Sequence, residues 1–167
     1  MWTLARTLIY ASGFIGLLLV FLPARVLSAS GIAAAPSLGP RQVAGLVLAL
    51  AGAALTATCI LTFAFAGKGT PAPFDPPRRL VVRGPYKIVR NPMYLGAGLL
   101  LTGAAAYYGS TGLVLYAAAF LLAMHGFVVL YEEPTLHRMF GADYDAYCAS
   151  VGRWWPKRLF ARLTRSV

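Results

Sequence analysis

Residues 93–131 read MYLGAGLLLTGAAAYYGSTGLVLYAAAFLLAMHGFVVLY, a run of 39 residues without Asp, Glu, Lys or Arg. As a single helix this run would be about 58 Å long at 1.5 Å per residue, roughly twice the thickness of a bilayer's hydrocarbon core. It must therefore fold back on itself, and the turn-forming sequence Gly-Ser-Thr-Gly at 109–112 predicts where. We expect a tight helical hairpin made of residues 93–108 and 113–131.

Two further stretches are apolar enough to cross a bilayer, which takes about 20 residues. They are residues 2–22 and 43–66. The first could instead be a signal peptide, since small residues follow it at 28–30, although its apolar run is longer than such peptides usually carry. Together with the hairpin, these stretches predict about four transmembrane helices.

Composition supports a membrane protein. The 167 residues are 59% hydrophobic and only 12% charged, whereas a soluble domain carries about 25% charged residues. This composition has too few polar residues to cover the surface of a soluble enzyme, and a disordered chain would have far lower hydrophobicity. We expect one all-α membrane domain, residues 1–167, without nucleic-acid binding despite the net charge of +10.

The basic residues are distributed unevenly. Of the 15 Lys and Arg, only Arg25 and Arg41 fall on the side opposite to both termini if there are four spans. Because basic residues mark cytoplasmic loops, we expect the termini, the loop 67–92 and the tail 132–167 on the cytoplasmic side of an inner membrane. The basic end of the tail is expected to contact anionic lipid.

The loop 67–92 contains six prolines. Proline prevents helix formation and stiffens a chain, so this loop is either one wall of a site or a stiff connector held at the membrane. In the tail, Tyr144, Tyr147 and Val151 are spaced to lie on one face of a short helix.

Two of the five acidic residues, Glu132 and Glu133, are neighbours at the predicted membrane boundary. Acidic residues in such positions often serve function, although they could also face water and stabilise the next helix through its dipole. Glu133 and His137 are spaced for a shared metal ion, but no third ligand is evident, so we expect no metal site. Within the fourth span, His125 is expected to hydrogen-bond to a neighbouring helix.

Small residues recur in the second apolar stretch at Gly45, Ala49 and Ala53. This spacing would allow a neighbouring helix to approach closely. It could equally reflect simple richness in alanine.

Residues 84–96 read GPYKIVRNPMYLG, and Glu132-Glu133 follow the hairpin. These strings resemble the superfamily of isoprenylcysteine carboxyl methyltransferases and phospholipid N-methyltransferases, which are integral membrane enzymes. The order and spacing of the later matches also fit; they are Leu136, Phe140-Gly141, Tyr144, Tyr147, Arg153 and Pro156. The resemblance spans residues 84–156 and leaves out the first two apolar stretches.

The resemblance implies methyl transfer from S-adenosylmethionine to a lipophilic small molecule or lipid, in a cytoplasmic pocket formed by the last two spans and the tail. It implies that Glu132 or Glu133 binds the cofactor amine, and that the two glycines let the cofactor lie against the third span. The implied cofactor-binding residues are Tyr86, Arg90, Asn91, Pro92, Tyr94, Gly96, Gly98, Glu132 and Glu133. The implied catalytic residues are Arg153, Glu133 and Tyr94.

One residue departs from the family pattern, which has a histidine where this chain has Asn91. An amide cannot accept a proton near pH 7, so a carboxylate or thiolate acceptor is favoured over an amine. We therefore expect an enzyme similar to isoprenylcysteine carboxyl methyltransferases. The alternatives are a phospholipid or small-molecule N- or S-methyltransferase and, in another class, a non-catalytic small membrane subunit.

Overall fold

The computed structural model describes residues 13, 15–32, 34, 36–63 and 80–157. All elements of the described part are helices, and its only β-type pairing is an isolated parallel bridge between Val89 and Gly152. The elements in chain order are the π-helix η1 (Gly16–Phe21), α2 (Leu22–Ala29), α3 (Pro40–Thr62), the 3-10 helix η3 (Gly84–Lys87), α4 (Pro92–Tyr108), α5 (Thr111–Phe127), the π-helix η4 (Val128–Glu132), α6 (Glu133–Phe140) and α7 (Ala142–Ser150).

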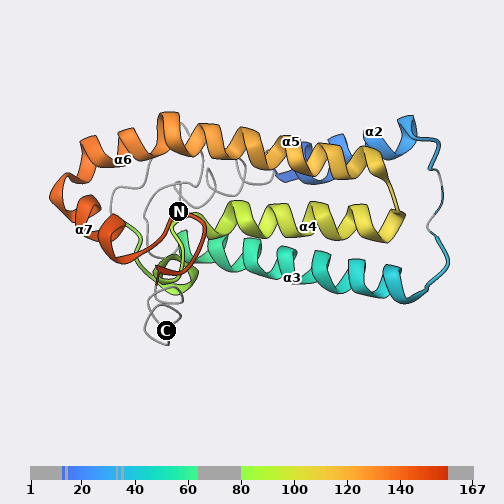
Figure 1. Cartoon of the computed structure of the whole chain (residues 1–167), viewed down its shortest axis with the longest axis horizontal. Coiled ribbons are helices and arrows are strands. Elements are labelled where there is room, and N and C mark those ends of the chain that lie inside the picture. Colours follow the sequence, from blue (N-terminus) through green and yellow to red (C-terminus); the bar gives the residue numbers. More distant parts are fainter. Residues whose placement is uncertain (1–12, 14, 33, 35, 64–79, 158–167) are drawn as a thin grey trace, which may run out of the picture.

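Helix α4 lies in the middle of the bundle, between α3 on one side and α5 on the other (Figure 1). The N-terminal pair η1–α2 packs against α4 and α5. The apolar core between η1, α4 and α5 contains Leu19, Ala97, Leu101, Ala117 and Phe120. The protein is thus a bundle organised around one central apolar helix.

The predicted hairpin is present, and its turn is shorter than the four residues expected. Gly109 adopts a left-handed conformation (φ 64°, ψ 32°), which ends α4 and which glycine adopts without steric cost. The Ser110 hydroxyl then accepts a hydrogen bond of 3.2 Å from the Leu113 backbone N–H and caps α5. Two residues therefore reverse the chain.

Two helices are long and apolar enough to cross a membrane, judged by length and composition. One is Pro40–Thr62, and the other is the continuous helix Thr111–Phe140, which combines α5, η4 and α6. Helix α4 has 17 residues and is shorter. Most of the predicted first span and half of the proline-rich loop 67–92, residues 67–79, lie outside the described residues.

Helices α3 and α4 pack through a seam of small residues. A Cβ atom on Gly45 would lie 2.6 Å from the backbone N of Tyr107, and one on Gly52 would lie 2.5 Å from the carbonyl O of Gly96. From the other side, a Cβ atom on Gly103 would lie 2.6 Å from the carbonyl O of Gly45. The two backbones are therefore in direct contact, as small residues at helix interfaces allow.

Replacing Gly52 by Ala should destabilise this seam by about 1–3 kcal/mol, because the methyl group meets backbone atoms that cannot rotate away. Thermal unfolding of the purified protein in detergent measures the loss. Gly16→Ala is the matched control, since a Cβ atom there meets nothing within 4 Å. Equal melting temperatures for the two variants would show that the helices are not in close contact.

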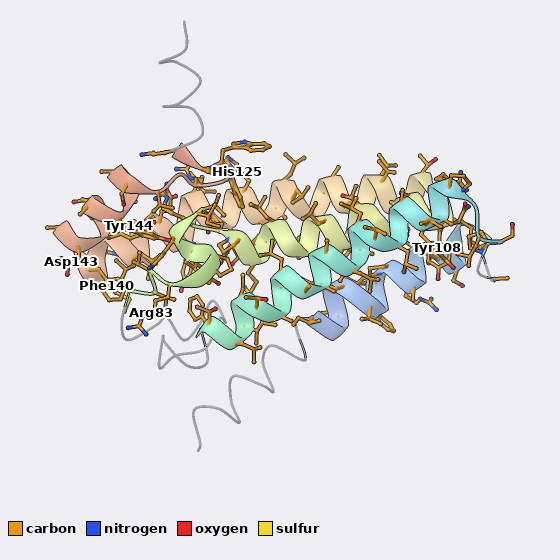
Figure 2. The ribbon with its side chains drawn as sticks, turned by 90° about the horizontal axis from the view of Figure 1, so that it is seen from below. Arg83, Tyr108, His125, Phe140, Asp143 and Tyr144 are labelled. Atoms are coloured by element: carbon orange, nitrogen blue, oxygen red, sulfur yellow. The ribbon has the colours of Figure 1, made fainter. Side chains whose placement is uncertain are left out.

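The bundle has two dissimilar ends. Tyr108 marks the end with the hairpin turn, while Arg83, Phe140, Asp143 and Tyr144 lie at the opposite end (Figure 2). At this second end α7 carries a small buried cluster of Tyr144, Tyr147 and Val151, as the spacing of these residues predicted. The end with α6 and α7 contains most of the polar contacts of the described residues.

Candidate active site

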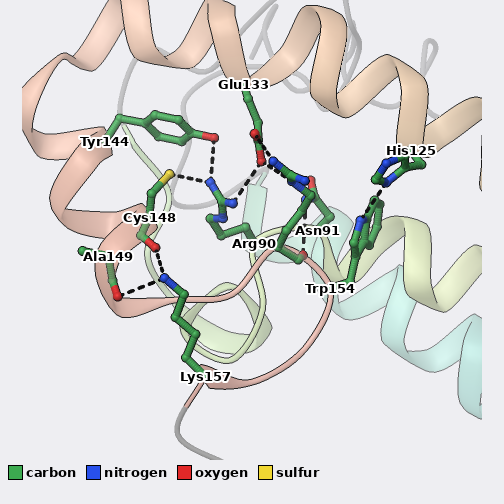
Figure 3. A network of polar contacts seen from close by, with 10 residues as sticks. Arg90, Asn91, His125, Glu133, Tyr144, Cys148, Ala149, Trp154 and Lys157 are labelled. Atoms are coloured by element: carbon green, nitrogen blue, oxygen red, sulfur yellow. Dashed lines mark hydrogen bonds and ion pairs between the residues drawn. The ribbon is translucent and has the colours of Figure 1, made fainter. Parts of the chain in front are cut away.

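Three segments that are distant in sequence meet at the α6–α7 end of the bundle (Figure 3). They are the stretch from the residues after η3 into the first turn of α4, the junction of η4 with α6, and the chain that follows α7. The π-helical turn Val128–Glu132 lies at this junction, directly before Glu133. Such turns change the direction of side chains within a helix and are frequent at functional sites.

Glu133 is the centre of an ion-pair cluster. Arg153 binds its carboxylate with two parallel hydrogen bonds of 2.7 Å, from Nε to Oε1 and from Nη2 to Oε2. Arg90 Nη2 lies 3.0 Å from the same Oε1 atom. The hydrogen bonds that Arg153 donates to Glu133 raise the pKa of the Arg153 guanidinium. One carboxylate thus holds two guanidinium groups, which leaves an excess of positive charge.

Helix α7 orients Arg90 from the other side. Arg90 Nη1 donates a hydrogen bond of 3.3 Å to the Tyr144 hydroxyl and contacts Cys148 Sγ. Arg90 Nε is buried and has no hydrogen-bond partner among the described residues. A buried guanidinium N–H without a partner is costly, so this atom is suited to bind an acceptor group brought by a ligand.

Backbone pairing joins the segment before α4 to the segment after α7, and we call residues 89–91 and 152–153 the clasp. The Arg90 N–H donates a hydrogen bond of 2.8 Å to the Gly152 carbonyl, next to the Val89–Gly152 bridge. The Asn91 side-chain amide donates to the Arg153 carbonyl at 3.3 Å. The clasp therefore brings Arg90 and Arg153 together, although they are 63 positions apart in the chain.

Glu132 lies apart from this cluster and has a different partner. Its Oε2 atom accepts a hydrogen bond of 3.2 Å from the Tyr94 hydroxyl on α4. The two adjacent acids therefore differ: Glu133 is neutralised by two arginines, while Glu132 has a tyrosine hydroxyl as its hydrogen-bond partner. Among the described residues, Glu132 is therefore the acid of this pair that has no arginine as its ion-pair partner.

The remaining predicted site residues belong to the surrounding packing. Tyr86 is buried against Cys59 of α3, and its carbonyl accepts a hydrogen bond of 2.7 Å from the Tyr147 hydroxyl. Burial raises the pKa of Tyr147, which keeps this hydroxyl protonated as a donor. Pro92 is fully buried in the first turn of α4.

The two predicted glycines face other helices. A Cβ atom on Gly96 would meet Thr56 of α3 at 2.6 Å, and one on Gly98 would meet the Leu121 side chain of α5 at 2.7 Å. The close approach at Gly96 is thus already occupied by α3. The role of both residues in cofactor binding stays a prediction.

Sequence reasoning did not anticipate the contacts of Arg90 with α7. Tyr144 was expected on one face of a short helix and in the family pattern, but not as a partner of Arg90, and Cys148 was not expected to take part. His125 was expected to bond to a neighbouring helix, whereas its Nδ1 atom accepts a hydrogen bond of 3.1 Å from Trp154 of the tail. A contact between Cys148 and Arg90 carries no signal in a single sequence, because it depends on how α7 folds back.

The fold and this cluster define an α-helical protein of the membrane type, with a charged site at one end of an apolar bundle. A family model described as phospholipid methyltransferase matches residues 40–143, from α3 to the start of α7. Because this is more than half of the chain, the protein belongs to the phospholipid methyltransferase family, and the predicted superfamily is confirmed. No curated protein and no solved structure gives a significant match.

Family membership indicates a membrane methyltransferase that acts on lipid-like substrates. The matched range contains Arg90, Asn91, Tyr94 and both glutamates, whereas Arg153 lies beyond its end. The bidentate pair between Arg153 and Glu133 therefore attaches the tail to the family core.

Proposed function

We propose that this protein transfers a methyl group from S-adenosylmethionine to a lipophilic acceptor at the α6–α7 end of the bundle, on the cytoplasmic face of the membrane. One observation carries the proposal: the Arg90–Glu133–Arg153 cluster gathers the family motif and the tail at the polar end of an apolar bundle.

The residues present fit this cofactor. The cluster has excess positive charge, and the Arg90 Nε–H has no partner in the part of the chain that the structure describes; both features suit the cofactor's carboxylate. Glu132, hydrogen-bonded to Tyr94, suits the cofactor's amine. The sequence left open which of the two acids binds the cofactor amine. Because Glu133 is paired with two arginines, we propose that Glu132 binds it.

The bound cofactor would supply a methyl group on a sulfonium, which is open to direct attack by the acceptor. The protein's own contribution is to position the reactants, and good positioning alone can supply several kcal/mol of the barrier reduction. Tyr94 and Glu132 orient the amino end, and Arg90 with Arg153 orients anionic groups. Arg153 is 35% exposed in its side chain, so it can also reach an anionic acceptor.

For the acceptor we propose a lipophilic carboxylate or thiolate, as in isoprenylcysteine carboxyl methyltransferases. The excess positive charge beside Glu133 attracts an anion, and Asn91 cannot remove a proton from an ammonium group. The second candidate is the amine of a phospholipid, which the family match favours.

Binding of S-adenosylmethionine separates an enzyme from a non-catalytic subunit. At about 100 times its dissociation constant, the cofactor should stabilise the purified protein by about 2.7 kcal/mol, which thermal unfolding detects. An unshifted melting temperature at millimolar cofactor would contradict the proposal. A panel with a prenylated cysteine and with phosphatidylethanolamine then distinguishes the acceptors, and efficient methylation of the phospholipid would overturn our preference.

The proposed topology has four spans and both termini in the cytoplasm. In a variant lacking Cys59 and Cys148, cysteines placed at Ser37 and Ser166 should react with an impermeant reagent from opposite sides of the membrane. The physical reason is the uneven distribution of Lys and Arg. Reaction of both positions from the same side would exclude this topology.

A further inference from the structure

We infer that Asn91 is a positioning residue: its side-chain amide fixes the main chain at Arg153 so that the Arg153 guanidinium reaches Glu133. This inference rests on the proposed function. It assigns Asn91 an action on the cofactor site through another residue, Arg153.

The position of Asn91 supports this role. It precedes α4 and is only 6% exposed, so its amide is withdrawn from solvent and needs a partner within the protein. That partner is the carbonyl of Arg153, at 3.3 Å. The side chain of the same residue makes the two 2.7 Å hydrogen bonds to Glu133. A single residue is therefore held at its carbonyl by Asn91 and at its guanidinium by Glu133.

The segment after α7 has other attachments, which separate positioning from folding. Gly152 is bonded to the Arg90 N–H, the Trp154 indole to His125, and the Lys157 ammonium to the carbonyls of Cys148 and Ala149. Removing the Asn91 amide leaves all of these in place. The tail should then stay attached while the carbonyl and side chain of Arg153 lose their fixed orientation.

The inference also predicts which substitutions are tolerated. A residue with an N–H group that reaches the Arg153 carbonyl should restore the arrangement, and histidine has such a group. Leucine is similar in size to asparagine, but its side chain has no N–H donor. The pair Asn91→Leu and Asn91→His therefore compares side chains without and with a donor.

Tryptic cleavage after Arg153 provides a readout that does not depend on activity. In the full-length protein in detergent, cleavage there should be slow, because the side chain is held by Glu133 and the carbonyl by Asn91. We expect Asn91→Leu to accelerate it several-fold and Asn91→His to return it close to the native rate. Cleavage after the exposed Arg138 of α6 is the control and should stay unchanged in all three proteins.

Cofactor affinity provides the second readout. Asn91→Leu should weaken S-adenosylmethionine binding by about five- to tenfold, the effect of about one lost hydrogen bond. In an Arg153→Ala background the same substitution should have almost no further effect, because Asn91 acts through Arg153. Unchanged cleavage after Arg153 in Asn91→Leu, or fully independent effects of the two substitutions, would overturn the inference. If the native protein binds no cofactor, the proposed function fails. The cleavage rates still test whether Asn91 positions Arg153.

Discussion

Glu133→Gln should produce the largest change of any single side-chain substitution at the site. Gln has nearly the same shape, but it leaves Arg90 and Arg153 without their shared counter-charge. Breaking a buried ion pair costs about 3–5 kcal/mol; since the Glu133 side chain is 18% exposed, we expect a loss near 2–3 kcal/mol after screening by solvent. Methyl transfer should fall by at least about a hundredfold, because both arginines lose their orientation.

Thermal unfolding and cofactor titration of the same samples measure these effects. Asp143→Asn is the control, because Asp143 is an exposed acid in the first turn of α7 and its replacement should change stability by no more than about 0.5 kcal/mol. Glu132→Gln should weaken cofactor binding with a smaller loss of stability, since it replaces one hydrogen bond from Tyr94. Native stability and affinity in Glu133→Gln would contradict the central role of the cluster.

Gly152→Ala should have the second large effect. A Cβ atom there would overlap the carbonyl oxygen of Trp155 and would lie 3.4 Å from the side chain of Lys157. Because the first of these is a backbone atom, the chain after α7 has to move, and the clasp opens. We expect loss of most of the transferase activity and rapid tryptic cleavage after Arg153, while the apolar helices remain folded.

Gly126→Ala is the matched control for this substitution. Gly126 lies in α5 near the same end of the bundle, and a Cβ atom on it meets nothing within 4 Å. Its replacement should be neutral or raise stability by up to about 1 kcal/mol through helix propensity. Native activity in Gly152→Ala would show that the segment after α7 does not shape the site.

The hairpin could be predicted from sequence because hydrophobic length and turn chemistry are local properties. The seam between α3 and α4 was only partly predictable. Gly45 and Ala49 were recognised, but Ala53 was named where the structure uses Gly52. At 3.6 residues per turn a position seven residues after Gly45 returns to the same face, whereas one eight residues after it is rotated away. The contact face becomes certain only once the partner helix is placed.

The boundary between the last span and the tail is a further difference. The sequence suggested that a new helix begins after Tyr131, whereas the helix continues from Thr111 to Phe140 through the π-helical turn. Pro134 lies in the first turn of α6, two residues after the π-helical turn ends at Glu132. A π-helical turn leaves no recognisable pattern in a single sequence.

At the site, the family pattern located Arg90, Asn91, Tyr94, Glu132 and Glu133, and the structure places them at one end of the bundle. Their division of labour was not predictable, because it depends on contacts made through the clasp. Arg153 reaches Glu133 only after the chain has passed through α6 and α7 and returned to Arg90. The pairing of Glu133 with two arginines is the reason why we propose Glu132 for the amine.

The central claim is tested most directly by incubating the purified protein with S-adenosylmethionine carrying a labelled methyl group and a total lipid extract. We predict label in the lipid fraction with the native protein. With Arg153→Ala we predict at least about a hundredfold less label, because this variant lacks the guanidinium that holds Glu133. Lipid labelling that is absent from the native protein, or equal in both proteins, would contradict the assignment of a methyltransferase site to the Arg90–Glu133–Arg153 cluster.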